Sequence, residues 1–225
     1  MVSESVEEYL EAAYKLGGGE TPVAISLLAK RLQVSPVSAH EMVKKLAKLG
    51  LVSYTPYKGV TLTEEGRSQA LRVIRRHRLW ERFLADVLGL PWDQVHEEAC
   101  RLEHATSPLV EEKLAEFLAE PEFCPHGNPV PTEEGSVVIE EACALSELGP
   151  GQRGRVLRVS EEEPGLLQHL DALGLRPHAE VLVEEVAPFQ GPLTVLVEGV
   201  RQTLGQWVAS QIMVQRMPVH GNESS

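Results

Sequence analysis

Apolar side chains recur every three or four positions through the first half of the chain, the spacing that gathers them on one face of a helix. The pattern predicts helices over residues 4–16, 22–31, 36–49, 63–88, 91–103 and 107–119. Between the third and fourth of these, residues 51–63 are predicted to form a hairpin whose tip lies at 56–59. We therefore expect the N-terminal two-thirds of the protein to be mainly α-helical.

The last third follows a different pattern, in which apolar and polar residues alternate over short stretches bounded by glycine and proline. The alternation predicts strands at 154–159, 180–186, 193–197, 200–204 and 211–215. Short strands at such close intervals are typical of a small barrel, so we expect an all-β C-terminal domain.

A helix, a tight break, a second helix and a hairpin follow one another at the N-terminus, in the order of a winged helix-turn-helix. The second helix, residues 36–49, is then expected to enter the major groove of DNA. Its apolar residues are expected to face inward: Val37, Met42, Val43, Leu46 and Leu49. The predicted DNA-contacting residues lie at the start of this helix, on its polar face or at the tip of the wing. They are Ser35, Val37, Ser38, Glu41, Lys44, Lys45, Lys48 and Lys58, so Val37 is included although it is also expected to face inward. An amphipathic helix with a hydrated lysine face is the alternative interpretation.

Composition and charge limit the classes of protein to consider. With 43% hydrophobic and 24% charged residues, the 225-residue chain has the composition of a folded globular protein. It lacks any apolar run near twenty residues, and its acidic start is unlike a secretory signal, so we expect a cytoplasmic protein with no membrane partner. The net charge is −12, but residues 1–75 hold ten basic against eight acidic residues, which keeps the predicted DNA-binding part near neutral.

Three side chains that can bind a metal ion share one helical face near the middle of the chain. Cys100, Glu103 and His104 stand at positions i, i+3 and i+4, which brings a thiolate, a carboxylate and an imidazole within reach of one cation. The chain has three cysteines, an odd and widely spaced set that favours thiols or metal ligands over disulfides.

Further metal-binding side chains lie at helical spacing nearby. His96 precedes Cys100 by one turn, and His77 and Glu81 form another i, i+4 pair. Each of these residues alone is commonly structural, but their combination predicts a metal site. The sequence lacks the His-Glu-x-x-His motif of zinc hydrolases and an obvious general base, so a site beside a DNA-binding module favours metal sensing over catalysis.

Four motifs resemble the iron- and manganese-dependent repressor family. They are YLEAAY at 9–14, RHRLWERFL at 76–84, VHEEACRLEH at 95–104 and GNPVP at 127–131. The resemblance covers nearly the whole chain and implies a fold in several parts. These are a winged helix-turn-helix domain at 1–72, a helical dimerisation and metal-binding domain at 73–135, a linker at 136–150, an SH3-like domain of the FeoA type at 151–217 and a tail at 218–225.

The resemblance also implies two metal sites. The primary site would consist of Glu8, Glu11, Cys100, Glu103 and His104. An ancillary site would use His77 and Glu81, with either His96 or the loop residues Cys124 and His126, and would be completed by a carboxylate such as Glu162. A cysteine at 100 resembles the iron-type members and a carboxylate at 8 the manganese-type members. Mn(II) is the favoured cofactor and Fe(II) the next, with Zn(II) or Co(II) as substitutes in vitro.

The expected function is a metal-dependent repressor of metal-uptake genes that binds operator double-stranded DNA as a homodimer, and not an enzyme with a small-molecule substrate. Our hypothesis is that a cation joins the first helix to the segment 100–104, where carboxylates and a thiol would otherwise repel one another. Two recognition helices would then fit successive major grooves, about 34 Å apart. Two alternatives are a metal-independent DNA-binding protein and a metal-dependent hydrolase. The C-terminal barrel could either stabilise the protein or bind a partner.

Overall fold

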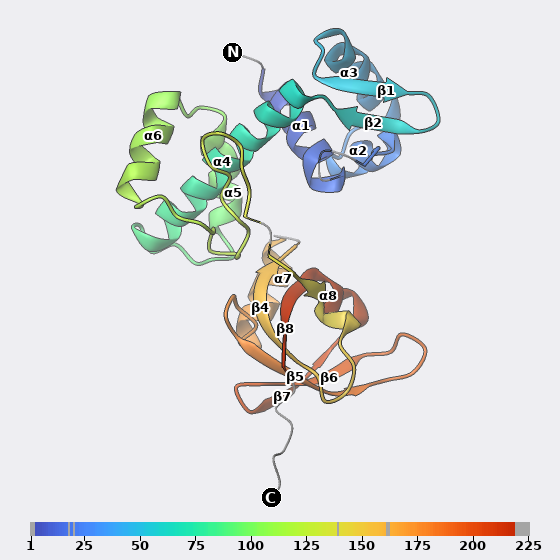
Figure 1. Ribbon diagram of the computed structural model, residues 1–225, viewed down its shortest axis with the longest axis vertical. Coiled ribbons are helices and arrows are strands. Elements are labelled where there is room, and N and C mark those ends of the chain that lie inside the picture. The colour runs from blue at the N-terminus through green and yellow to red at the C-terminus, as the bar shows by residue number, and fades with distance from the viewer. Residues whose placement is uncertain (1–2, 18, 20, 139, 161–162, 219–225) are drawn as a thin grey trace, which may run out of the picture. The chain divides into compact units, whose positions relative to one another are not determined.

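The structure is a computed structural model that describes residues 3–17, 19, 21–138, 140–160 and 163–218 (Figure 1). The chain divides into two compact units. Unit 1 consists of Met1–His77, Cys100–Glu112 and Pro131–Val137, and unit 2 of Arg78–Ala99, Lys113–Val130 and Val138–Ser225. No helix of the described ranges combines the length and the apolar character needed to cross a bilayer.

Unit 1 contains the winged helix-turn-helix. Its elements are α1 (Glu4–Gly17), α2 (Ile25–Arg31), α3 (Pro36–Lys48), β1 (Val52–Thr55) and β2 (Gly59–Leu62), with β1 and β2 antiparallel. Figure 1 shows the three helices grouped beside the hairpin. Leu10, Leu28 and Val43 lie in their shared core. The start of α2 was predicted wrongly, because Val23 pairs with Val60 in an isolated bridge and is not helical.

Three helices follow the wing as predicted: α4 (Glu64–Asp86), α5 (Val95–Glu103) and α6 (Pro108–Phe117). The predicted ends were less accurate. Residues 91–94 form a turn, closed by the Gln94 amide donating to the Pro91 carbonyl, so α5 starts four residues later than expected. Ala119 and Glu120 both adopt positive φ, which a continuing helix does not allow.

The C-terminal part of unit 2 is a six-stranded antiparallel sheet in the order β3-β8-β4-β5-β6-β7. The strands are β3 (Cys143–Ala144), β4 (Arg153–Val159), β5 (Glu180–Val186), β6 (Leu193–Val197), β7 (Val200–Leu204) and β8 (Ile212–Met217). The predicted bounds are confirmed for β5 to β7, whereas β4 starts one residue earlier than predicted and β8 starts one residue and ends two residues later. The short β3 and the 3-10 turn η1 (Leu145–Glu147) lie in the predicted linker.

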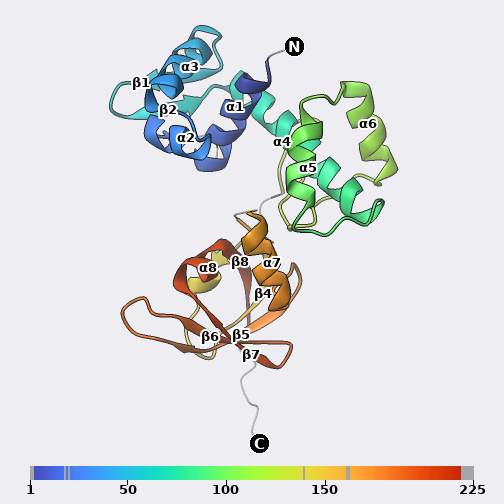
Figure 2. The ribbon, with the colours of Figure 1, turned by 180° about the vertical axis from the view of Figure 1, so that it is seen from behind.

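Two helices that the sequence reading did not predict accompany these strands (Figure 2). They are α7 (Pro164–Ala172) and α8 (Gln206–Gln211). Leu167 and Leu170 of α7 and Ala209 of α8 are fully buried, in the same core as the inward side chains of the strands. The C-terminal domain is therefore a small barrel whose core is closed by two helical segments.

Candidate metal centres and DNA interface

The first candidate centre lies in unit 1, where α1, α4 and the end of α5 meet. We call it the helix-one cluster and define it by six residues: Glu8, Glu11, His77, Cys100, Glu103 and His104. Ligand atoms of Glu11, His77 and Glu103 lie within 4.8 Å of one another. His77 Nδ1 is 2.5 Å from Glu103 Oε2 and 3.9 Å from the Cys100 sulfur. His77, expected in the ancillary site, thus lies beside residues expected in the primary one.

The second half of the helix-one cluster surrounds His104. Ligand atoms of Glu4, Glu8 and His104 also lie within 4.8 Å of one another. His104 Nε2 is 3.1 Å from Glu103 Oε1, so the two groups of three are in contact. All five residues predicted for the primary site therefore lie in one continuous network within unit 1.

Glu103 is a carboxyl of this network whose ionisation is opposed by burial. Its side chain is 2% exposed. Burial raises the pKa of the Glu103 carboxyl, the hydrogen bond with His77 lowers it, and the nearby Glu11 carboxylate raises it again, with a net increase. A divalent cation would stabilise the ionised forms of both carboxylates. Carboxylate oxygens and imidazole nitrogens are also suitable donors for such an ion, so the residues present fit a metal site.

Glu7 belongs to the same network, although the sequence reading did not select it. Its Oε2 lies 2.7 Å from His104 Nδ1, and its Oε1 accepts a 2.9 Å hydrogen bond from Arg76. Burial opposes ionisation of Glu7, but these two partners outweigh it and hold the pKa of the carboxyl below its ordinary value. The hydrogen bond that the Glu7 carboxylate accepts from His104 is the main cause that raises the pKa of His104. Glu7 could have been found from its helical spacing with Glu11, which places both residues on one face of α1.

The second candidate centre lies in unit 2, and we call it the buried cluster: Glu81, Cys124 and His126. Their exposed fractions are 0%, 2% and 0%. Glu81 Oε1 is 3.1 Å from His126 Nδ1, and the Cys124 sulfur is 4.0 Å from the same nitrogen. His96 Nδ1 also approaches Glu81 Oε1, at 3.4 Å, so both predicted alternatives for the ancillary site contact Glu81. Glu162 lies outside the described residues.

A backbone carbonyl orients the His126 ring. Its Nε2 lies 2.7 Å from the Trp92 carbonyl, to which an Nε2–H would donate, and this leaves Nδ1 directed at the other cluster members. Burial alone would lower the pKa of His126, but the Glu81 carboxylate and Cys124 raise it to about 12. A cation at Nδ1 would have to displace that proton, so binding at the buried cluster would release protons.

The loop that carries Cys124 and His126 is tied to β4. The Val159 amide donates to the His126 carbonyl at 3.1 Å, and the Asn128 side chain donates to the Val159 carbonyl at 3.2 Å. Gly127, at φ +81°, lies so close to β4 that a Cβ there would be 1.9 Å from the Leu157 carbonyl oxygen. The loop conformation therefore requires glycine at this position.

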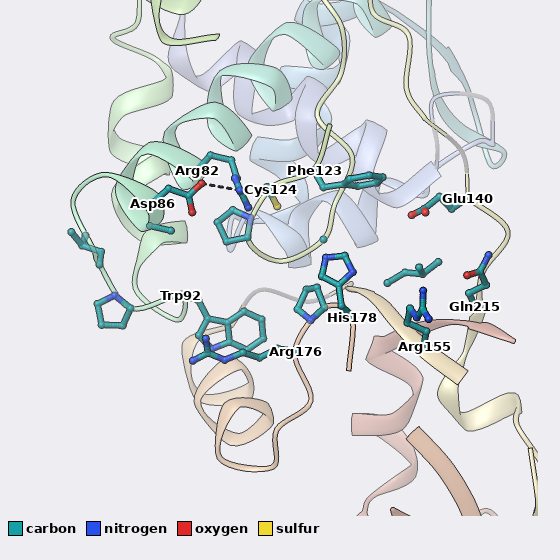
Figure 3. Close-up of a pocket in the computed structure, with 17 residues that line it drawn as sticks. Arg82, Asp86, Trp92, Phe123, Cys124, Glu140, Arg155, Arg176, His178 and Gln215 are labelled. Carbon is teal, nitrogen blue, oxygen red and sulfur yellow. Dashed lines mark ion pairs between the residues drawn. The ribbon is translucent and has the colours of Figure 1, made fainter. Parts of the chain in front are cut away.

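A cavity of about 530 Å³ borders the buried cluster within unit 2 (Figure 3). Of the cluster, Cys124 is among the lining residues, and Figure 3 shows its sulfur near Phe123 at the edge of the cavity. Trp92 also lines it, with the Arg176 guanidinium 5.4 Å from the centre of its ring. The cavity therefore borders the buried cluster at Cys124.

The predicted DNA-contacting residues all have exposed side chains, on α3 and at the tip of the wing. Ser35 caps α3 by accepting a hydrogen bond from the Ser38 amide. Glu41 forms a 3.0 Å ion pair with Lys44, which lowers the pKa of Glu41 and offsets its repulsion of phosphates. Next to Lys58, Tyr57 is fully exposed at φ +65°, a wing residue that the sequence reading did not select.

The inward orientation expected for two apolar residues of α3 is wrong. Val37 is 73% exposed and Leu49 is 53% exposed. The buried stripe consists of Ala39, Val43 and Leu46, at i, i+4 and i+7. Val37 lies in the first turn of α3, before this stripe begins, and Leu49 lies just after the last turn. Exposure of Val37 agrees with its place among the predicted DNA contacts.

Three protein-family models match the chain. The N-terminal DNA-binding domain of iron-dependent repressors matches residues 1–60, and their metal-binding and dimerisation domain matches residues 63–132. The FeoA domain matches residues 143–216.

Similar proteins match between 70% and 95% of this chain. The iron-dependent repressor IdeR of Mycobacterium tuberculosis is 35% identical over 228 residues, covering 95% of this chain and 98% of IdeR. The diphtheria toxin repressor of Corynebacterium glutamicum is 39% identical over 166 residues, 70% of this chain and 72% of that repressor. A solved manganese-dependent transcriptional repressor in complex with manganese superposes with a TM-score of 0.88 at 34% identity, covering 94% of this chain and 100% of that one. ScaR with bound Cd²⁺ gives a TM-score of 0.83 at 31% identity, with 94% and 99% covered.

Proposed function

Because the chain belongs to the iron-dependent repressor family and is a metal-dependent repressor, we propose that its own co-repressor is Mn(II), with Fe(II) next in preference. The helix-one cluster is the proposed primary site and the buried cluster the proposed ancillary site. Loaded with metal, a homodimer binds operator double-stranded DNA in the cytoplasm and represses genes of metal uptake.

The observation that supports this proposal most directly is the meeting of α1 with the end of α5. Glu11 of α1 and Glu103 of α5 bring two carboxylates together beside a buried imidazole. When bound, a cation supplies the positive charge that offsets their repulsion. Since α1 is part of the winged helix-turn-helix, metal binding would fix α1, and with it the DNA-binding elements, against α5. A coupling free energy of about 1–3 kcal/mol would suffice for useful switching.

The donor atoms favour manganese with iron close behind. The helix-one cluster offers carboxylates and imidazoles, which suit the hard Mn(II) ion, while the Cys100 thiol favours softer ions such as Fe(II). The buried cluster adds a second thiol at Cys124. Zn(II) and Co(II) bind most such sites more tightly than Mn(II), so they are expected to substitute in vitro.

The proposed contact with DNA is made by α3 and the wing. Lys44, Lys45 and Lys48 are exposed on α3 and suit phosphate contacts. In a homodimer, the two α3 helices would occupy successive major grooves, about 34 Å apart.

A gel-shift titration tests the proposal. The full chain is titrated on DNA from upstream of its own gene with Mn²⁺, Fe²⁺ or Zn²⁺ under anaerobic conditions. We expect DNA binding to require metal, and we expect Glu11→Ala and His104→Ala to bind DNA weakly whether or not metal is present. Glu198→Ala, at an exposed turn of the barrel, is the matched control. Equal DNA affinity with and without metal would instead support the metal-independent alternative.

A further inference from the structure

We propose that Glu7 is a positioning residue of the helix-one cluster, which holds the His104 ring so that Nε2 faces the metal position. The inference rests on the proposed role of His104 as a metal ligand. It concerns a residue outside the predicted ligand set, and it assigns different roles to two consecutive carboxylates of α1.

The first argument is the occupancy of both Glu7 oxygens. Oε1 accepts from Arg76 Nη2 at 2.9 Å, and Oε2 lies 2.7 Å from His104 Nδ1. Glu7 is only 8% exposed, so these two contacts replace its hydration. A carboxylate whose two oxygens already have hydrogen-bond partners is better suited to orient a metal ligand than to bind the metal itself. The neighbouring Glu8 is exposed, and its ligand atom lies within 4.8 Å of one on His104.

The second argument is the direction that this contact gives to the ring. When Nδ1–H donates to Glu7, the lone pair of His104 is on Nε2. That nitrogen is 3.1 Å from Glu103 Oε1, a predicted metal ligand. A carboxylate that binds the far nitrogen of a ligating histidine fixes its tautomer and makes it a stronger donor.

The third argument is that Glu7 is itself held in place. Arg76 lies on α4 next to His77, and its second terminal nitrogen is 3.4 Å from the Thr106 carbonyl. Arg76 therefore connects the segment after α5 to α1 through Glu7. The chain Arg76–Glu7–His104 places the imidazole before any cation arrives, which lowers the ordering cost of binding.

The test compares three variants of the full-length protein by calorimetric titration with Mn²⁺. Glu7→Ala is expected to lower affinity at the helix-one cluster about 10- to 100-fold, the usual effect of removing such a partner. Glu7→Gln is expected to recover part of that loss, because its amide oxygen can still accept from Nδ1–H. Glu97→Gln removes the same charge from an exposed position of α5 and should match the wild type.

A second readout needs no metal. Nitrogen-15 NMR of the metal-free protein, recorded at a pH high enough for the His104 ring to be neutral, should show the remaining proton on Nδ1 in the wild type and in Glu7→Gln, and a tautomer mixture in Glu7→Ala. Unchanged tautomer and unchanged Mn²⁺ affinity in Glu7→Ala would overturn the inference. If the wild type itself binds no Mn²⁺, the proposed function fails, and the NMR comparison still decides whether Glu7 positions His104.

Discussion

At the scale of single residues, neighbouring carboxylates on one helix have different environments. Glu7 is buried between a guanidinium and an imidazole, while Glu8 is exposed and Glu11 forms a 2.9 Å ion pair with Lys15. Successive positions on an α-helix are turned by about 100° from one another, so adjacent acidic residues differ in burial, even though Glu7 and Glu8 both approach His104. A cation at the proposed primary site would therefore meet acids that differ in burial and in ion pairing.

The Glu7–His104 contact predicts a pH window of stability in the metal-free protein. The pKa of Glu7 is lowered from 4.5 and that of His104 is raised from 6.5. The Glu7 contribution is present above 4.5 and is lost as pH falls through its lowered pKa, and the His104 contribution is present below 6.5 and is lost as pH rises through its raised pKa. The free energy of unfolding of the wild type should exceed that of Glu7→Gln by about 1 kcal/mol within this window, a modest value because solvent partly screens the pair.

Denaturant unfolding across pH measures this difference. Glu97→Gln, which removes an exposed acid, should show a small and nearly constant difference from the wild type. A wild-type advantage over Glu7→Gln that stays constant from strong acid to alkaline pH would contradict the assignment.

The two buried or partly buried thiols of unit 2 offer a matched comparison for the ancillary site. Cys124 belongs to the buried cluster, whereas Cys143 lies on β3 and contacts the Val214 carbonyl. Cys124→Ser should lower metal affinity at the buried cluster by about tenfold or more, because a hydroxyl is a weaker ligand than a thiolate for the softer ions. Cys143→Ser should leave it unchanged. Equilibrium dialysis with Co²⁺ checks the prediction, and equal binding by both variants would exclude Cys124 as a ligand.

Sequence spacing identified only the part of the candidate sites that lies on single helices. Cys100, Glu103 and His104 are readable at i, i+3 and i+4, but nothing in local spacing pairs them with α1, more than eighty residues earlier. The prediction that Glu8 and Glu11 of α1 are ligands rested on the family resemblance. Glu7 was missed because its role depends on Arg76 and His104, contacts that only the folded chain creates.

At the scale of secondary-structure elements, the loop between α6 and β3 carries the strictest local requirement. Gly127→Ala places a methyl group against the Leu157 carbonyl and also forces an L-residue to keep φ near +81°. We expect a loss of about 3 kcal/mol or more in the free energy of unfolding of unit 2, with weaker metal binding at the buried cluster. Gly151→Ala has nearly the same φ, +80°, and no atom within 4 Å, so it should cost only about 1 kcal/mol. Similar losses in both variants would contradict the packing argument.

The lysines of α3 predict the salt dependence of DNA binding. Lys48→Ala should weaken operator binding and lower the slope of log affinity against log salt by about 0.9, the effect of one lost phosphate contact. Arg201→Ala removes a charge from β7, where Arg201 pairs with Glu184, and should leave the slope unchanged. Fluorescence anisotropy in the presence of Mn²⁺ measures both, and an unchanged slope for Lys48→Ala would remove this residue from the interface.

Long helices and alternating strands were predictable from sequence, and the short helices among the strands were not. Three turns of apolar spacing predicted α1, α3 and α4 to within a few residues. Helices α7 and α8 were missed because they are short and lie among strands, although Pro164 after the capping Glu163 is a recognisable helix start. Sequence alone also gave no signal that Val23 would pair with Val60 and delay α2.

At the scale of the whole molecule, apolar side chains remain uncovered in the helical part of unit 2. Val87 and Leu88, just after α4, are 45% and 56% exposed, and Phe117 at the end of α6 is 65% exposed. The Phe117 ring lies 6.0 Å from that of Phe83. Exposed apolar groups on a monomer commonly mark an interface, and the match to a dimerisation domain makes a second copy of the chain the expected partner.

Phe117→Glu is therefore expected to shift the protein from dimer to monomer at micromolar concentration. Phe189→Glu is the matched control, because Phe189 is fully exposed at the β5–β6 turn of the barrel. Sedimentation velocity distinguishes the two. A Phe117→Glu protein that stays dimeric, or a Phe189→Glu protein that becomes monomeric, would place the dimer contact elsewhere.

The hydrogen bonds between the loop that carries Cys124 and His126 and strand β4 make the buried cluster depend on the C-terminal barrel. If the coding sequence stopped after residue 137, Glu11, His77 and Glu103 would all remain, whereas His126 and Asn128 would lose their partners on Val159. The barrel thus holds in place, through β4, the loop that carries Cys124 and His126. If both proposed sites bind metal, deletion of the barrel should leave a regulator that responds through the helix-one cluster alone.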